Sequence, residues 1–68
     1  MLKFSERLKD LRLEKELSQR QLAKATGISQ NAITSWETNK TIPLANAIVA
    51  LAKFFDVTTD YILGVTED

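Results

Sequence analysis

The sequence predicts an all-α protein built from five short helices, and three observations support this fold class. Hydrophobic residues recur at intervals of three and four positions, the spacing of one helix face. Only two glycines and one proline occur in 68 residues, so few positions interrupt a helix. No run alternates hydrophobic and polar residues as a half-buried β-strand does. We therefore expect one compact domain over residues 1–68, with residues 65–68 forming a frayed tail.

The first helix is expected from Ser5 to about Glu16. Ser5 is a candidate N-cap, because its hydroxyl can accept a hydrogen bond from a free backbone amide of the first turn. Phe4, Leu8 and Leu11 follow at i, i+4 and i+7, so they lie on one helix face. This face is expected to contribute to the core.

The second helix is expected from Gln19 to Thr26. Ser18 precedes it and Gln21 follows three residues later, which is the Ser-x-x-Gln pattern of a capping box. Gly27 comes directly after the last helical residue, where a left-handed backbone commonly ends a helix. The pattern therefore fixes both ends of this helix.

The third helix is expected to begin at Ser29 and to end near Asn39. Its inward face carries Ile33 and Trp36, three residues apart. Because only about three residues around Gly27 separate it from the second helix, the two form a helix-turn-helix arrangement.

A fourth helix is expected from Leu44 to Phe55, where Asp56 and the next residue break the pattern. Thr58 is a candidate N-cap for a short fifth helix that stops at Gly64. These two helices complete the predicted five-helix domain.

The composition excludes several function classes. No cysteine or histidine is present, so we expect no disulfide, no metal site and no catalytic residue of the usual nucleophilic or acid–base kind. We therefore expect no enzyme activity, no cofactor and no small-molecule ligand. The longest hydrophobic stretch is about half of the ~20 residues that a membrane span needs, and the N-terminal region lacks the hydrophobic segment of a signal peptide. We expect a cytoplasmic protein without membrane contact.

The net charge of zero conceals an uneven distribution along the chain. Residues 1–40 contain eight basic and five acidic residues, a net charge of +3, whereas residues 41–68 contain one basic and four acidic residues, a net charge of −3. The two charges are expected to form a dipole that could orient the domain on an anionic partner.

The outward face of the third helix is polar and carries Gln30, Asn31, Thr34 and Ser35. Glutamine and asparagine can form two hydrogen bonds with adenine in the major groove, and serine and threonine can contact most bases. We therefore expect these four side chains to contact base edges of double-stranded DNA.

With these features the chain resembles the lambda-repressor-like, Cro/Xre-type helix-turn-helix domains of phage and bacterial regulators. The matching segments are residues 17–19, 22–23, 26–29, 36–37, 51–53 and 57–64, together with Ile33, Lys40 and Pro43. The resemblance covers about residues 4–64. It implies five helices, with the helix-turn-helix at the second and third helices and the third as the recognition helix.

The resemblance also implies further site residues. Gln19, Asn39, Lys40 and Thr41 correspond to positions that contact DNA phosphates in relatives. Arg20, beside Gln19, is a further phosphate candidate as an exposed cation. Relatives pair an arginine at the place of Arg12 with a glutamate at the place of Glu37, so these two residues are expected to form a structural salt bridge.

A two-fold homodimer through the fifth helix is also implied, with Thr59, Ile62 and Leu63 as interface candidates. Such a dimer binds two half-sites about one helical turn of DNA apart. The expected function is that of a sequence-specific transcriptional regulator, acting as a repressor on a pseudopalindromic operator.

Two alternatives stay open at this point. The third helix contains no lysine or arginine, and Asn39 replaces a frequent glycine. A protein-interaction module that uses the hydrophobic surface of the fourth and fifth helices is one alternative. The other is the DNA-binding part of an antitoxin or of a restriction-modification controller.

Overall fold

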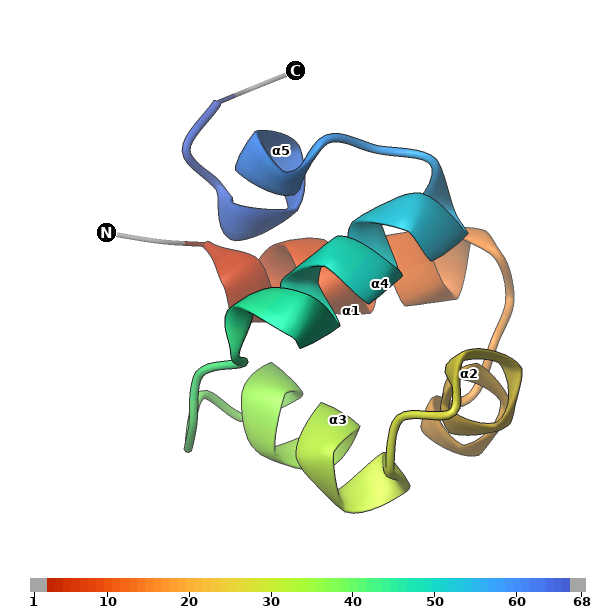
Figure 1. Cartoon of the computed structure of the whole chain (residues 1–68). Coiled ribbons are helices and arrows are strands. Elements are labelled where there is room, and N and C mark those ends of the chain that lie inside the picture. The colour runs from red at the N-terminus through yellow and green to blue at the C-terminus, as the bar shows by residue number, and fades with distance from the viewer. Residues whose placement is uncertain (1–2, 67–68) are drawn as a thin grey trace.

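The computed structural model describes residues 3–66, which form an all-α fold with five helices (Figure 1). The helices are α1 (Phe4–Glu14), α2 (Gln19–Thr26), α3 (Gln30–Glu37), α4 (Ala45–Phe55) and α5 (Thr59–Leu63). No strand occurs within the described residues. The predicted fold class and the number of helices are confirmed.

One side chain from each helix lies at the centre of the molecule without any exposed surface. These residues are Leu8, Leu22, Ile33, Leu51 and Ile62, in chain order from α1 to α5. All five helices therefore share a single core. Displacing any one helix would expose a hydrophobic side chain that contributes about 1.5–3 kcal/mol by its burial.

The helix ends that depend on local capping agree with the sequence prediction. Ser18 accepts a hydrogen bond from the Gln21 amide at 3.0 Å, and the Gln21 side chain accepts one from the Ser18 amide at 2.7 Å. Ser29 caps α3 and Thr58 caps α5 in the same way, each through its hydroxyl oxygen. Gly27 ends α2 with φ +78°, a left-handed conformation that glycine adopts without a steric penalty.

The start of α1 was predicted one residue too late. Ser5 lies inside the helix, and Lys3 occupies the N-cap position without a side-chain cap. The Lys3 carbonyl accepts the first helical hydrogen bond from the Arg7 amide at 2.9 Å. The reason is tertiary, since Phe4 is buried and its ring packs edge-to-face on Trp36 at a centroid distance of 6.0 Å.

Three other boundaries differ by one or two residues. Helix α1 ends at Glu14, and Glu16 has left-handed backbone angles instead of helical ones. Helix α3 ends at Glu37, and Asn39 adopts the left-handed conformation two residues later, with φ +65°. Leu44 is the N-cap of α4 and forms no side-chain capping bond.

The last described residues continue the hydrogen bonding of α5. Gly64 ends the helix with φ +83°, and the Val65 amide donates to the Asp60 carbonyl at 2.9 Å. The Thr66 carbonyl accepts a hydrogen bond from the Arg7 guanidinium at 3.1 Å. Of the expected tail, residues 65 and 66 are thus bonded to the domain, and residues 67–68 lie outside the described part.

The first turn of α1 is attached to the end of α5. The Lys3 amide donates to the Leu63 carbonyl at 3.1 Å. The Arg7 guanidinium lies over the Tyr61 ring, 4.2 Å from its centroid, and also donates to the Tyr61 carbonyl at 2.7 Å. Gly64 lies so close to the start of α1 that an added Cβ would be 2.6 Å from the Lys3 nitrogen.

No described helix is long and hydrophobic enough to cross a membrane.

Candidate nucleic-acid interface

Helices α2 and α3 and the turn at Gly27 form the edge of the molecule opposite α5 (Figure 1). Ile33 and Trp36 fix α3 to the core, since both side chains are buried. Ala32, Thr34 and Ser35 of this helix are half-buried. Its first turn exposes Gln30 and Asn31.

The four predicted base-contact residues differ in their surroundings. Gln30 and Asn31 are exposed, and their side chains form no hydrogen bond with other described residues. Ser35 is half-buried, and its hydroxyl likewise has no bond among these residues. Thr34 is half-buried too, but its hydroxyl takes part in a polar network that joins three helices.

The centre of this network is a buried ion pair between α1 and α3. Arg12 Nε lies 2.7 Å from Glu37 Oε2, and Arg12 Nη2 lies 2.8 Å from Glu37 Oε1. The two side chains are only 9% and 3% exposed. The remaining Arg12 nitrogen, Nη1, donates to the Leu17 carbonyl at 2.8 Å, so the bidentate pair also fixes the loop before α2.

The pair changes the ionisation of both partners. Burial opposes the charged form of Glu37, but hydrogen bonds from Arg12 and Gln19 and the positive charge of Arg12 outweigh it, so its pKa lies below the usual 4.5. The hydrogen bond with Glu37 raises the Arg12 pKa, although burial acts in the opposite direction. Both groups are therefore charged near neutral pH.

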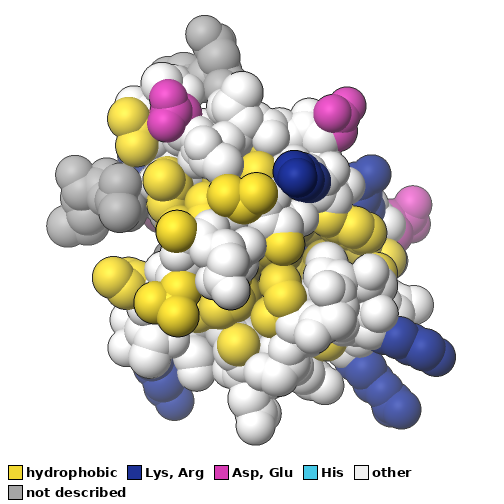
Figure 2. All heavy atoms as spheres, in the orientation of Figure 1, with side chains coloured by type: hydrophobic (Ala, Val, Ile, Leu, Met, Phe, Trp, Pro, Cys, Tyr) yellow, Lys and Arg dark blue, Asp and Glu magenta, His cyan; other side chains and the backbone are white. Residues whose placement is uncertain are grey.

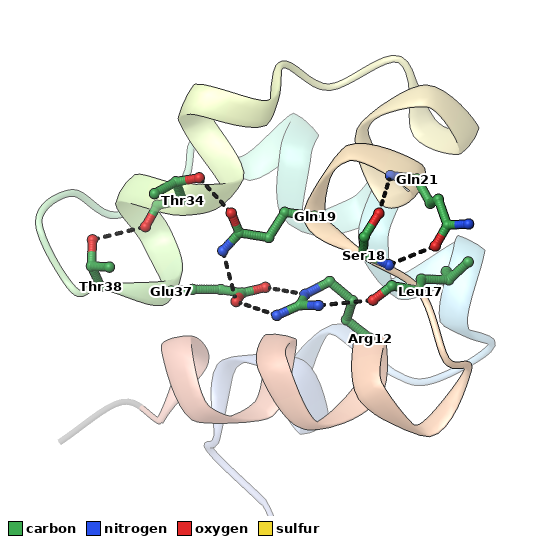
Figure 3. A network of polar contacts seen from close by, with 8 residues as sticks. All are labelled: Arg12, Leu17, Ser18, Gln19, Gln21, Thr34, Glu37 and Thr38. Atoms are coloured by element: carbon green, nitrogen blue, oxygen red, sulfur yellow. Dashed lines mark hydrogen bonds and ion pairs between the residues drawn. The ribbon is translucent and has the colours of Figure 1, made fainter.

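Gln19 connects the ion pair with the recognition helix (Figure 3). Its Nε2 donates to Glu37 Oε1 at 3.1 Å, and its Oε1 accepts from the Thr34 hydroxyl at 2.7 Å. The sequence suggested only a phosphate contact for Gln19. No periodic pattern relates residues 15 and 18 positions apart on two helices, so this bridging position was missed.

The candidate phosphate contacts come from two segments of the chain. Arg20 is exposed in the first turn of α2, and Asn39, Lys40 and Thr41 are exposed directly after α3. The Lys40 amide donates to the Ser35 carbonyl at 2.8 Å, which holds this loop against the helix end. In the view of Figure 2, some Lys and Arg side chains project from the edge that α2 and α3 form, and others lie in the opposite half of the molecule, where the Asp and Glu side chains of this view are found.

The predicted dimer-interface residues are not equally accessible. Thr59 is exposed and Leu63 is half-buried. Ile62 has no exposed surface because it fills the centre of the core, so its assignment to an interface was wrong.

A hydrophobic groove lies beside Leu63. The sequence suggested a hydrophobic partner surface on the fourth and fifth helices, but not that it extends to the connection between α3 and α4. It is lined by Leu63, Trp36, Ile42 and Pro43 among others. Ile42 is 80% exposed and Leu44 is 77% exposed, and Figure 2 shows hydrophobic side chains on the side where the α3–α4 connection lies. Two hydrophobic residues flanking a proline in a connection are the signal that could have indicated this surface.

The surface formed by α2, α3 and the loop after α3 offers neutral hydrogen-bonding groups and a few cations. The described residues contain no group of three or more side chains that could hold a metal ion. These amides, hydroxyls and cations suit a partner whose surface is negatively charged and carries both hydrogen-bond donors and acceptors.

Comparison with known proteins identifies the fold family. The helix-turn-helix family matches residues 8–62 of the chain. The "HTH-type transcriptional activator BcrR" of Enterococcus faecalis is 39% identical over 97% of this chain, and the "Uncharacterized HTH-type transcriptional regulator YobD" of Bacillus subtilis is 37% identical over 96%. The "Cryptic phage CTXphi transcriptional repressor RstR" of Vibrio cholerae is 33% identical over 79%.

The aligned part of the chain covers 32%, 58% and 49% of the length of these three relatives, respectively. No solved structure matches. The family match extends from α1 to α5 and includes the ion pair, the Gly27 turn and the exposed face of α3. The chain therefore belongs to the helix-turn-helix family, together with these transcriptional regulators.

Proposed function

We propose that this domain binds double-stranded DNA sequence-specifically, with α3 in the major groove, and that it regulates transcription. The observation that carries the proposal is the first turn of α3, where Gln30 and Asn31 are exposed and form no hydrogen bond with other described residues. Each amide offers a donor and an acceptor side by side, which matches the N7 and N6 groups of adenine.

The phosphate contacts follow from the groups on either side of α3. Arg20 and Lys40 supply the positive charge, and Asn39 and Thr41 supply neutral donors. Gln19 uses one Nε2 hydrogen for Glu37, so the second hydrogen is available to a phosphate oxygen. Because few cations take part, we expect a shallow salt dependence compared with strongly basic DNA-binding domains.

The dimer that binds two half-sites is proposed to form through the groove beside Leu63. Ile42 lines the groove and Leu44 follows two residues later; both are exposed hydrophobic side chains, and a second copy is proposed to cover them. Thr59 is exposed on α5 and is proposed for the polar rim of this interface. An Ile42→Asp substitution should shift sedimentation toward the monomer while the circular dichroism spectrum stays helical.

Repression by occupancy is the proposed mode of regulation. A protein bound across a promoter excludes the polymerase without any further activity, so DNA binding alone accounts for it. The resemblance to a phage repressor supports this mode. Another relative is named as an activator. Transcription from a promoter that contains the selected site therefore has to be measured, because it distinguishes repression from activation.

The test is a binding-site selection from a randomised double-stranded DNA pool, with the wild-type protein, three test variants and one control variant. Gln30→Ala and Asn31→Ala should each change the preferred base at a defined position. Lys40→Ala should weaken binding to all sequences about equally and reduce the salt slope by about 1. Lys53→Ala removes an exposed cation of α4 and serves as the matched control, which should leave affinity unchanged.

Absence of enrichment by the wild-type protein, together with absence of a gel shift at low salt, contradicts the proposal. That result favours the alternative of a protein-interaction module. Enrichment with unchanged preferences in Gln30→Ala and Asn31→Ala contradicts only the assignment of the base contacts.

A further inference from the structure

The polar network between α1, α2 and α3 has a fixed direction of hydrogen bonding. The Glu37 carboxylate is ionised beside Arg12 and can only accept hydrogen bonds. The part of the Gln19 amide that faces Glu37 must therefore be the NH₂ group. Its carbonyl oxygen consequently faces the other way, toward Thr34 (Figure 3).

This direction determines the role of the Thr34 hydroxyl. Thr34 Oγ1 lies 2.7 Å from Gln19 Oε1, which is an acceptor without a hydrogen. The only hydrogen of the hydroxyl is thus used inside the protein. Toward a partner, Thr34 can offer lone pairs but no donor.

Thr34 is close to the two amides that are proposed to contact adenine. It lies three residues after Asn31 and four after Gln30, so the three side chains are neighbours on α3. Thr34 is half-buried, so part of the residue stays accessible.

We propose that Thr34 determines specificity by accepting a hydrogen bond from the amino group of a base. In the major groove, adenine N6 and cytosine N4 are the donors, whereas guanine and thymine present only acceptors and a methyl group. Thr34 therefore selects adenine or cytosine on the contacted strand. The inference rests on the proposed DNA binding and adds the chemical class of base at one position of the half-site.

The test compares base preferences in selections from the same randomised duplex pool. Thr34→Val keeps the shape but removes the hydroxyl, so one position should lose its preference for adenine or cytosine. Thr34→Ser should retain the preference. Thr38→Val is the matched control, since the Thr38 hydroxyl donates to the Thr34 carbonyl and has no assigned base contact, and it should change no base preference.

A fourth variant tests whether Gln19 is the reason that the Thr34 hydroxyl can only accept a hydrogen bond from DNA. Gln19→Met removes the acceptor and frees the Thr34 hydroxyl to donate, so the same position should also tolerate guanine and thymine. The loss of a phosphate contact at Gln19 lowers affinity for all sequences and leaves this comparison of bases intact. Circular dichroism establishes that each variant is folded.

A second measurement removes the amino group from the DNA. If the selected base is adenine, it is replaced by unsubstituted purine, which lacks the 6-amino group. Wild-type binding should then weaken about 2- to 10-fold, which is the effect of one ordinary hydrogen bond. Thr34→Val should bind both duplexes equally.

The inference is overturned if the wild-type protein enriches a site but Thr34→Val changes no position, or if the affected position prefers guanine or thymine. It is also overturned if Gln19→Met leaves that position as selective as before. Failure of the wild-type protein to enrich any site instead refutes the proposed function, and this inference with it.

Discussion

The α2–α3 unit and the α4–α5 unit have similar sizes but are held and exposed in different ways. Both helices of the first unit begin at a capping serine, and directional bonds through Gln19 and Glu37 fix them to each other and to α1. In the second unit α4 begins at Leu44 without a side-chain cap and contributes Leu51, Ala52 and Phe55 to the hydrophobic core. Helix α5 has the Thr58 cap, and hydrogen bonds from Lys3 and Arg7 attach its last turn to α1.

The surfaces of the two units differ accordingly. The α2–α3 unit exposes amides and hydroxyls, whereas the other unit and its preceding connection expose Ile42, Leu44 and Val65. Hydrogen bonds depend strongly on angle, so a surface that selects bases needs a backbone fixed by directional contacts. A surface that associates with a second copy needs only a hydrophobic area of suitable shape.

The largest effect is expected from breaking the ion pair that fixes the α2–α3 unit. Glu37→Ala leaves the Arg12 guanidinium buried without its carboxylate, which should lower the free energy of unfolding by about 3–5 kcal/mol. Urea unfolding followed by circular dichroism measures this change. The double variant Arg12→Met, Glu37→Leu leaves no unpaired charge, so it should lower the free energy of unfolding by less than Glu37→Ala does. A loss below about 1 kcal/mol in Glu37→Ala would contradict a structural role for the pair.

The next effect compares the glycine of each unit. Gly64→Ala must hold an alanine at φ +83° with its Cβ 2.6 Å from the Lys3 nitrogen, so we expect a loss of about 2–4 kcal/mol. Gly27→Ala has a similar φ of +78° but no atom within 4 Å of the added Cβ, and should lose only about 1–2 kcal/mol. Equal losses in thermal unfolding would show that the close contact at Gly64 has no energetic effect.

A smaller effect tests the difference in capping. Ser18→Ala removes one half of the capping box and should destabilise the protein by about 1 kcal/mol. Leu44→Ser adds the missing cap to α4 and removes an exposed hydrophobic side chain, so it should stabilise by about 0.5–1 kcal/mol. If Leu44→Ser destabilises the protein instead, the leucine side chain is covered, either within the domain or by the proposed second copy.

The smallest effect is the pH dependence of the stability that Glu37 contributes to the α2–α3 unit. Because the folded pKa of Glu37 lies below its ordinary value of 4.5, the ionised form stabilises the fold fully above about pH 4.5. This contribution is lost as the pH falls from 4.5 through the folded pKa. Denaturation midpoints measured between pH 6 and pH 3 should fall less steeply in Glu37→Gln than in the wild type, and identical slopes would exclude Glu37 as a source of the acid sensitivity.

The features that sequence predicted best are those determined by near neighbours. The Ser18–Gln21 capping box and the Gly27 turn each depend on fewer than five consecutive residues, and both are present. The Arg12–Glu37 pair was expected from the family resemblance, and the structure contains it.

The features that sequence missed depend on tertiary contacts. Helix α1 begins before Ser5 because Phe4 packs on a residue of α3. Helix α5 has only five residues, and three of them in a row are large and hydrophobic, so its periodicity could not show that Ile62 faces the core. The bridging role of Gln19 follows from side-chain angles that no linear pattern contains.

The hydrogen bond between Lys3 and Leu63 has a consequence for the cooperativity of unfolding. Backbone amides near a chain end ordinarily exchange with solvent through local fraying. The Lys3 amide instead donates to a carbonyl 60 positions away, so it becomes free only when α5 separates from α1. Its hydrogen-exchange rate should therefore follow the separation of α5 from α1, and this amide becomes a reporter of the contact between these two helices.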